Sequence, residues 1–129
     1  MTQRLSLLLA VLPVLAIGGM ACGDSNPLDS LSISQGVFGL TTYADDVCTG
    51  KCDTGPMSMT FSLLALPGET DVGSVTSTRE GFYEVALEPG RYRICTTFER
   101  CTEFVVEEGQ LVRLDYEFSV GPGWSAPPR

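Results

Sequence analysis

The cysteines of this chain are the residues with the widest choice of chemistry, because a thiol can form a disulfide, bind a metal or take part in redox reactions. The chain has five cysteines and no histidine. Three residues separate Cys48 from Cys52, whereas thiol redox sites favour two residues between the cysteines and a helix start. Zinc would need all of Cys48, Cys52, Cys95 and Cys101, since no histidine can contribute. This spacing favours neither redox chemistry nor zinc binding.

Acidic residues crowd the segment 43–56. It contains Asp45, Asp46 and Asp53, with Lys51 between them. Carboxylate oxygens can bind calcium, but the spacing matches no known calcium loop, so a solvated acidic loop is the favoured interpretation. Because long loops with varied side chains often form contact surfaces, we predict a binding loop made by Asp45, Asp46, Lys51 and Asp53, and no metal site.

The residue types offer little to catalysis. Histidine is the commonest general base, and it is absent. Only carboxylates and Lys51 remain to activate a serine or threonine. We therefore predict a protein with no catalytic residues and no cofactor. The alternative is a thiol-redox or hydrolytic accessory enzyme that uses Cys48 and Cys52 or the acidic loop.

The N-terminus has the pattern of an export signal. Arg4 precedes an apolar run over residues 5–17, which is shorter than the ~20 residues of a membrane-spanning helix. Gly19-Met20-Ala21-Cys22 follows. Ala21 and Cys22 resemble the lipobox of bacterial lipoproteins, although Gly19 stands where that family usually has Leu, Val or Ile. The resemblance implies cleavage after residue 21, lipid on Cys22, a membrane as partner, and a cell-envelope location, with the outer membrane as the default because Gly23 follows the cysteine.

The net charge of the chain is acidic. Sixteen Asp and Glu residues oppose eight Lys and Arg residues, and removal of Arg4 with the leader leaves a net charge of −9. Such a surface is a poor partner for nucleic acid, so we predict no nucleic-acid binding.

An even number of cysteines remains after Cys22. In a small exported domain, four cysteines predict two disulfides, for which three pairings are possible. We favour Cys48–Cys52 and Cys95–Cys101, because Cys95 and Cys101 flank a short loop between two predicted strands and residues facing each other on antiparallel strands lie at disulfide distance. A long-range bridge from Cys48 to Cys95 or Cys101 would stabilise more in the chain-entropy model and remains open.

The rest of the chain alternates apolar and polar residues with the two-residue period of β-strands. Seven short strands are predicted, with the third as an edge strand: residues 36–43, 57–63, 71–78, 83–87, 92–94, 104–106 and 111–118. This number and spacing are typical of a β-sandwich. We predict four segments: a signal peptide over residues 1–21, a lipidated N-terminus and tether over residues 22–35, a sandwich domain over residues 36–118, and a tail over residues 119–129. Because the tail is rich in Gly and Pro, we expect that it cannot extend a sheet.

Three short sequence motifs resemble those of a known family. They are Gly36-Val37-Phe38-Gly39, residues 78–83 (TREGFY) and residues 87–92 (LEPGRY). Together they are similar to the carboxypeptidase regulatory-like domains, which belong with the prealbumin-like, or Cna-B-like, sandwiches. The resemblance implies a seven-stranded antiparallel, all-β sandwich. It predicts architecture more than function, because one fold serves many roles. Our functional prediction is a membrane-tethered, non-catalytic module that is structural or binds an envelope protein or carbohydrate.

Overall fold

The structure is a computed structural model that describes residues 26–44, 54–119 and 123–127. These residues form one 3-10 helix and ten strands. The elements are η2 (Pro27–Ser30), β1 (Gly36–Ala44), β2 (Thr54–Pro56), β3 (Thr60–Leu66), β4 (Thr70–Thr76), β5 (Phe82–Ala86), β6 (Gly90–Thr96), β7 (Cys101–Val106), β8 (Leu111–Arg113), β9 (Asp115–Phe118) and β10 (Gly123–Ser125). None of the described helical segments is long and apolar enough to cross a membrane.

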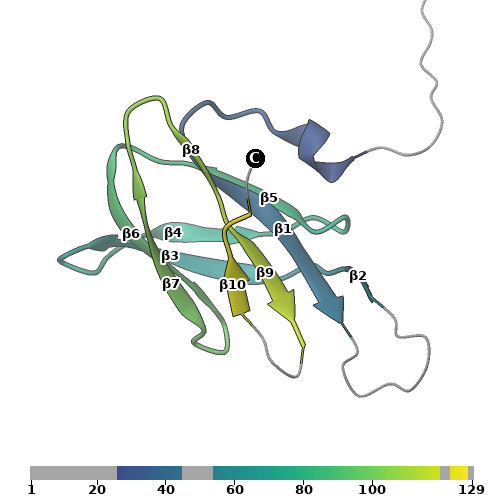
Figure 1. Ribbon diagram of the computed structural model, residues 1–129. Helices are drawn as coiled ribbons and strands as arrows, with labels where there is room; N and C mark the ends of the chain where they lie inside the picture. Colours follow the sequence, from purple (N-terminus) through teal and green to yellow (C-terminus); the bar gives the residue numbers. More distant parts are fainter. Residues whose placement is uncertain (1–25, 45–53, 120–122, 128–129) are drawn as a thin grey trace, which may run out of the picture.

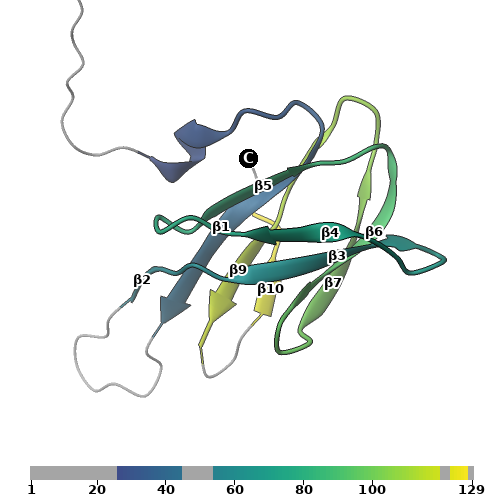
Figure 2. The same ribbon diagram turned by 180° about the vertical axis from the view of Figure 1, so that it is seen from behind.

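The strands form two sheets that pack face to face, which confirms the predicted all-β sandwich (Figures 1 and 2). One sheet has the order β4-β3-β6-β7. β4 lies at its edge, as predicted. The other sheet has the order β10-β9-β1-β2, and β5 and β8 also pair with β1.

β1 organises the second sheet, because different strands flank its two halves. The first half pairs with β5 and β8, and the second half pairs with β2 and β9. The pairings with β8 and β9 are parallel. The prediction of an antiparallel sandwich is therefore wrong for these two pairings, whereas the other pairings are antiparallel. Alternation within a strand does not specify the direction of a partner far away in the chain.

The number of strands also differs from the seven predicted. The last predicted strand is divided at Leu114 into β8 and β9, where the Asp115 carboxylate takes a hydrogen bond from the Leu40 amide at 2.9 Å. β2 and β10 are the other two additional strands. β10 pairs with β9, with Trp124 opposite Tyr116, so our expectation that the tail cannot extend a sheet is wrong.

The core lies between the two sheets. Most of its residues belong to apolar sets that alternate with polar residues in the sequence, but Phe118, which alternation sets on the same face as Leu114 and Tyr116, is 39% exposed. Phe61 contacts Tyr83 and Trp124, each at 5.2 Å between ring centroids, and Tyr116 contacts Trp124 at 5.0 Å. The buried cluster contains Val37, Met59, Phe61, Leu63, Tyr83, Tyr92, Ile94, Phe104, Val106, Leu114 and Tyr116. Trp124 packs against this cluster, so the C-terminal strand contributes to the core.

Gly39 allows β1 to approach the segment between β8 and β9. A Cβ atom at this position would overlap with the carbonyl oxygen of Leu114. We expect Gly39→Ala to lower the free energy of unfolding by about 1–3 kcal/mol, the usual cost of overpacking, because the backbone atoms of Leu114 cannot move aside easily. Urea unfolding followed by circular dichroism measures the change.

Gly123→Ala is the matched control, because a Cβ atom there has no neighbour within 4 Å. Its free energy of unfolding should change by no more than about 0.5 kcal/mol. Equal destabilisation by the two substitutions would contradict the proposed close approach at Gly39.

Candidate functional site

Several predicted site residues lie outside the described residues: Cys22, Cys48, Cys52 and the loop residues Asp45, Asp46, Lys51 and Asp53. The structure does describe the strands on either side of the predicted binding loop. β1 ends at Ala44 and β2 begins at Thr54, and the two pair in an antiparallel register that sets Tyr43 opposite Gly55. This pairing places both ends of the predicted loop at one place on the sheet.

A hollow of about 910 Å³ lies beside this pair of strands. Its lining comes from five parts of the chain: η2, β1, β2, the turn before β5, and β9. The lining residues are Pro27, Leu40, Thr42, Tyr43, Thr54, Gly55, Pro56, Arg79, Glu80 and Glu117. We call this the β1–β2 hollow.

The β1–β2 hollow combines apolar walls with charges of both signs. Leu40 and Tyr43 are apolar or aromatic, whereas Arg79, Glu80 and Glu117 can form ion pairs and hydrogen bonds with a ligand. The Tyr43 side chain is 39% exposed and lies close to the α-carbon of Gly55. Apolar walls with a few polar groups are the usual composition of a binding site.

Aromatic side chains continue from this hollow across the end of the sandwich. Phe118 is opposite Tyr43 in the register of β9 with β1, and its ring lies 6.0 Å from that of Phe98. Phe98 is 64% exposed and Phe118 is 39% exposed. The rings of Phe118 and Phe98 thus join the two sheets at this end, and Tyr43 is the neighbour of Phe118 in the sheet register. We call these three exposed residues the aromatic row.

The segment predicted as a tether lies on the sandwich from Asn26 onward. We call residues 26–35 the N-terminal strap. Ser32 donates to the Glu84 carboxylate through its amide at 2.8 Å and its hydroxyl at 2.6 Å. The Gln35 side chain donates to the Leu87 carbonyl and accepts from the Gly109 amide, both at 2.8 Å. The predicted boundary at residue 36 therefore cuts through hydrogen-bonded structure, because Ser32 and Gln35 form hydrogen bonds with the domain.

Glu84 is the acceptor that holds the middle of the N-terminal strap. Partial burial by itself would raise the pKa of Glu84, but the hydrogen bonds from Ser32 and Ile33 outweigh burial and lower this pKa below its ordinary value. The charged carboxylate is thus the form that binds the strap. Alternation in β5 predicted that Glu84 points outward, but nothing in the pattern indicated that it binds another segment.

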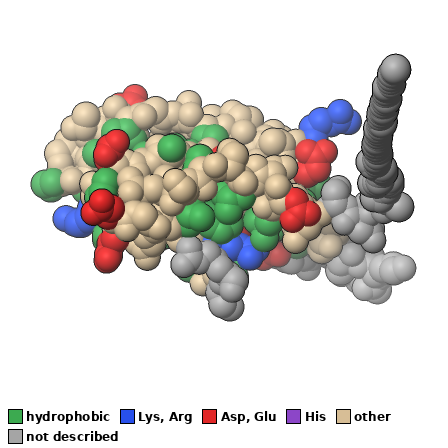
Figure 3. Space-filling model, turned by 90° about the horizontal axis from the view of Figure 1, so that it is seen from above, with side chains coloured by type: hydrophobic (Ala, Val, Ile, Leu, Met, Phe, Trp, Pro, Cys, Tyr) green, Lys and Arg blue, Asp and Glu red, His purple; other side chains and the backbone are tan. Residues whose placement is uncertain are grey.

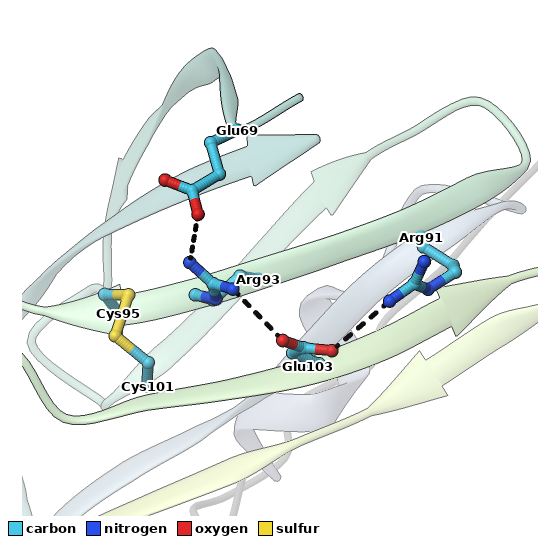
Figure 4. A network of polar contacts seen from close by, with 6 residues as sticks. All are labelled: Glu69, Arg91, Arg93, Cys95, Cys101 and Glu103. Atoms are coloured by element: carbon cyan, nitrogen blue, oxygen red, sulfur yellow. Dashed lines mark hydrogen bonds and ion pairs between the residues drawn. A yellow bond between two sulfur atoms is a disulfide. The ribbon is translucent and has the colours of Figure 1, made fainter. Parts of the chain in front are cut away.

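The outer face of the four-stranded sheet has a disulfide and an ion-pair network side by side (Figure 4). Cys95 and Cys101 are opposite each other on β6 and β7 and are bonded, so the Cys95–Cys101 prediction is confirmed. Next to them, Arg93 donates to Glu69 at 3.3 Å and to Glu103 at 3.1 Å, and these hydrogen bonds raise the pKa of Arg93. Arg91 also pairs with Glu103. The network joins the turn between β3 and β4 to β6 and β7.

The buried hydroxyl of Tyr83 has a structural role. It donates to the Leu114 carbonyl at 2.6 Å, and burial, with a smaller effect of the nearby Asp115 carboxylate, raises the pKa of Tyr83. The hydroxyl therefore keeps its proton and acts as a donor that links β5 to the segment between β8 and β9. Among the described residues, no group of three cysteines or carboxylates is placed to hold a metal ion.

The sequence did not indicate that Arg79, Glu80 and Glu117 belong to one site. Arg79 and Glu80 are far from Glu117 in the chain, and all three are far from β1.

Acidic side chains are spread over the face in Figure 3 and do not gather in one patch.

No protein-family model matches the chain, and no curated protein is detectably similar to it in sequence.

We predict that acid releases the N-terminal strap. Because the pKa of Glu84 is lower in the folded protein, its stabilisation is complete above the unfolded value of about 4.5 and is lost as the pH falls through the lower folded value. Hydrogen exchange of the Ser32 and Ile33 amides should be slow at neutral pH and should accelerate below about pH 4.5, relative to the core amides.

Glu84→Gln should make this exchange about fivefold faster at neutral pH, and the acceleration below about pH 4.5 should disappear, because the variant has no carboxylate at this position. We expect a loss of about 1 kcal/mol of local stability, since hydrogen bonds to a charged group are weakened at a partly exposed site. Glu108→Gln, at an exposed carboxylate in the turn before β8, is the control and should behave as the unchanged protein does. Slow exchange in Glu84→Gln at neutral pH would show that the strap does not depend on this carboxylate.

Proposed function

We propose that this protein is an exported lipoprotein, held in the bacterial outer membrane by lipid on Cys22, whose β-sandwich binds an envelope protein or carbohydrate without catalysis. The observation that carries the proposal is the Cys95–Cys101 disulfide. Structural disulfides are typical of oxidising compartments outside the cytoplasm, so this bond agrees with the export signal over residues 1–21. Cys22 then accounts for the odd number of cysteines.

The sandwich is of the prealbumin-like type in this proposal. The residues that carry the family resemblance have roles in the architecture. Gly39 allows the close approach of Leu114, Gly81 has a φ of 87° in the turn before β5, and the Tyr92 hydroxyl donates to the Glu88 carbonyl at 2.6 Å. These roles support the resemblance because each belongs to the fold.

The β1–β2 hollow is the proposed binding site. Its apolar and charged lining and the adjoining aromatic row suit a ligand with both apolar faces and hydrogen-bonding groups. The predicted binding loop of Asp45, Asp46, Lys51 and Asp53 begins and ends at the strands that line this hollow. The site therefore has groups that can bind a ligand, and it has no histidine base.

Intact mass of the membrane-extracted protein tests the anchor. We expect a mass equal to residues 22–129 plus acyl groups, with alkylation of the cysteines only after reduction. Cys22→Ser should abolish acylation and release the protein from membranes, whereas Cys95→Ser should leave acylation unchanged. An unacylated protein with free thiols would contradict the proposal and favour the thiol-redox alternative.

Photo-crosslinking in living cells tests the binding site. Replacement of Tyr43 by p-benzoyl-phenylalanine keeps an aromatic ring in the β1–β2 hollow and should give a defined covalent adduct with the ligand. The same replacement of Val105, which is 50% exposed on β7, is the control and should give no such adduct. Equal adducts at both positions, or none at Tyr43, would show that the hollow is not the contact surface.

A further inference from the structure

The N-terminal strap determines how far the sandwich can lie from a lipid on Cys22. If all of residues 22–35 were free chain, the link to Gly36 would extend to about 50 Å. The strap is bound to the domain from η2 onward, so only the residues between Cys22 and Pro27 can span the gap. The five steps along the chain from Cys22 to Pro27 extend at most about 17 Å. The bound strap therefore removes about two thirds of the available length.

The strap is fixed at three places along its length. At its start, η2 lies beside Phe82 and the turn that contains Thr78 and Glu80, and these residues line a small hollow together. In the middle, Ser32 and Ile33 donate to the Glu84 carboxylate. At its end, the Gln35 carbonyl accepts from the Leu87 amide. The attachment point of the link is thus a defined place on the sandwich and not a loose end.

This attachment point lies on one side of the molecule. η2 contacts β1 and β5, whereas β6 and β7 belong to the other sheet. Both ribbon views show η2 and β7 on opposite sides of the sandwich (Figures 1 and 2). A lipid within about 17 Å of Pro27 therefore lies close to η2 and to the turn with Arg79 and Glu80 that lines the β1–β2 hollow with Pro27.

We propose that the surface formed by η2 and the Arg79–Glu80 turn faces the lipid headgroups, and that the outer face of β6 and β7 points away from the membrane. The proposal rests on the lipid anchor at Cys22. Pro27, Arg79 and Glu80 belong to the wall that the β1–β2 hollow shares with this surface, so in this orientation the hollow and its proposed ligand lie next to the zwitterionic headgroups. The acidic net charge of −9 without the leader argues against an anionic lipid surface.

Fluorescence quenching by lipid with a spin-labelled headgroup tests this orientation. The acylated full-length protein is placed in phosphatidylethanolamine and phosphatidylcholine nanodiscs, with Trp124→Phe to remove the native fluorophore. A reporter tryptophan is introduced on the sandwich itself, by Glu80→Trp in the exposed turn before β5 or by Val105→Trp on β7. We expect quenching to be several-fold stronger for Glu80→Trp. Equal quenching, or stronger quenching for Val105→Trp, would overturn the orientation.

Release of the strap provides a second test. Ser32→Ala with Glu84→Gln should lengthen the link and bring the two quenching values closer together, whereas Ser34→Ala should leave their ratio unchanged. An unchanged ratio in the released variant would overturn the role of the strap. If Trp124→Phe does not fold, p-benzoyl-phenylalanine at Glu80 or Val105 in the otherwise unchanged protein should crosslink to lipid only at Glu80, and crosslinking at Val105 would contradict the orientation.

Different experimental results would contradict this inference and the lipoprotein proposal. An acylated protein that is bound to nanodiscs but shows no preference for the η2 side contradicts the orientation alone. A protein whose intact mass shows no acyl groups contradicts the anchor, and the orientation falls with it.

Discussion

The hydrogen bonding of β1 is the constraint on which the rest of the structure depends. A buried strand must pair its amide and carbonyl groups along both edges, and β1 does so with four strands instead of two. The change of partners occurs near Gly39 and Leu40. There the Asp115 carboxylate accepts from the Leu40 amide in place of a backbone carbonyl. This side chain lets β8 and β9 continue along the same edge of β1 with one interruption.

The same region connects the sheet to the core. Leu114, at the interruption, is buried, and its carbonyl accepts from the Tyr83 hydroxyl. Its amide donates to the Phe38 carbonyl, and its carbonyl oxygen lies where a side chain at Gly39 would be. Hydrogen bonds and close packing thus restrain Leu114 from several directions. The position of β9, and of β10 with Trp124, follows from this restraint.

Features that depend on neighbours in the chain could be predicted from the sequence. Alternation placed Met59, Phe61 and Leu63 on one face, and all three are buried. The spacing of Cys95 and Cys101 across a short turn predicted their disulfide. Partners far away in the chain could not be predicted, because alternation shows which face of a strand is buried but not which strand lies beside it. The parallel pairing of β1 with β9 and the bond from Ser32 to Glu84 are of this kind.

Polar residues near the ends of the predicted domain were harder to interpret than apolar ones. Ser32 and Gln35 have the composition of a solvated linker, and the short strand around Trp124 lies in a segment rich in Gly and Pro. Their structure comes from single hydrogen bonds and one large ring, neither of which produces a periodic pattern. The candidate site also leaves no periodic pattern in the sequence, because Arg79 reaches the β1–β2 hollow from a turn and Glu117 reaches it from a separate strand.

The disulfide and the N-terminal strap restrain the chain in different ways. Cys95 and Cys101 are only six residues apart, so in the chain-entropy model their bond stabilises the fold by about 2 kcal/mol. The strap instead joins residues separated by about fifty positions, such as Ser32 and Glu84. The disulfide therefore acts locally and holds the turn that carries Phe98 beside Phe118. The strap acts on the whole sandwich, because it determines where the chain enters and which side lies nearest to that entry.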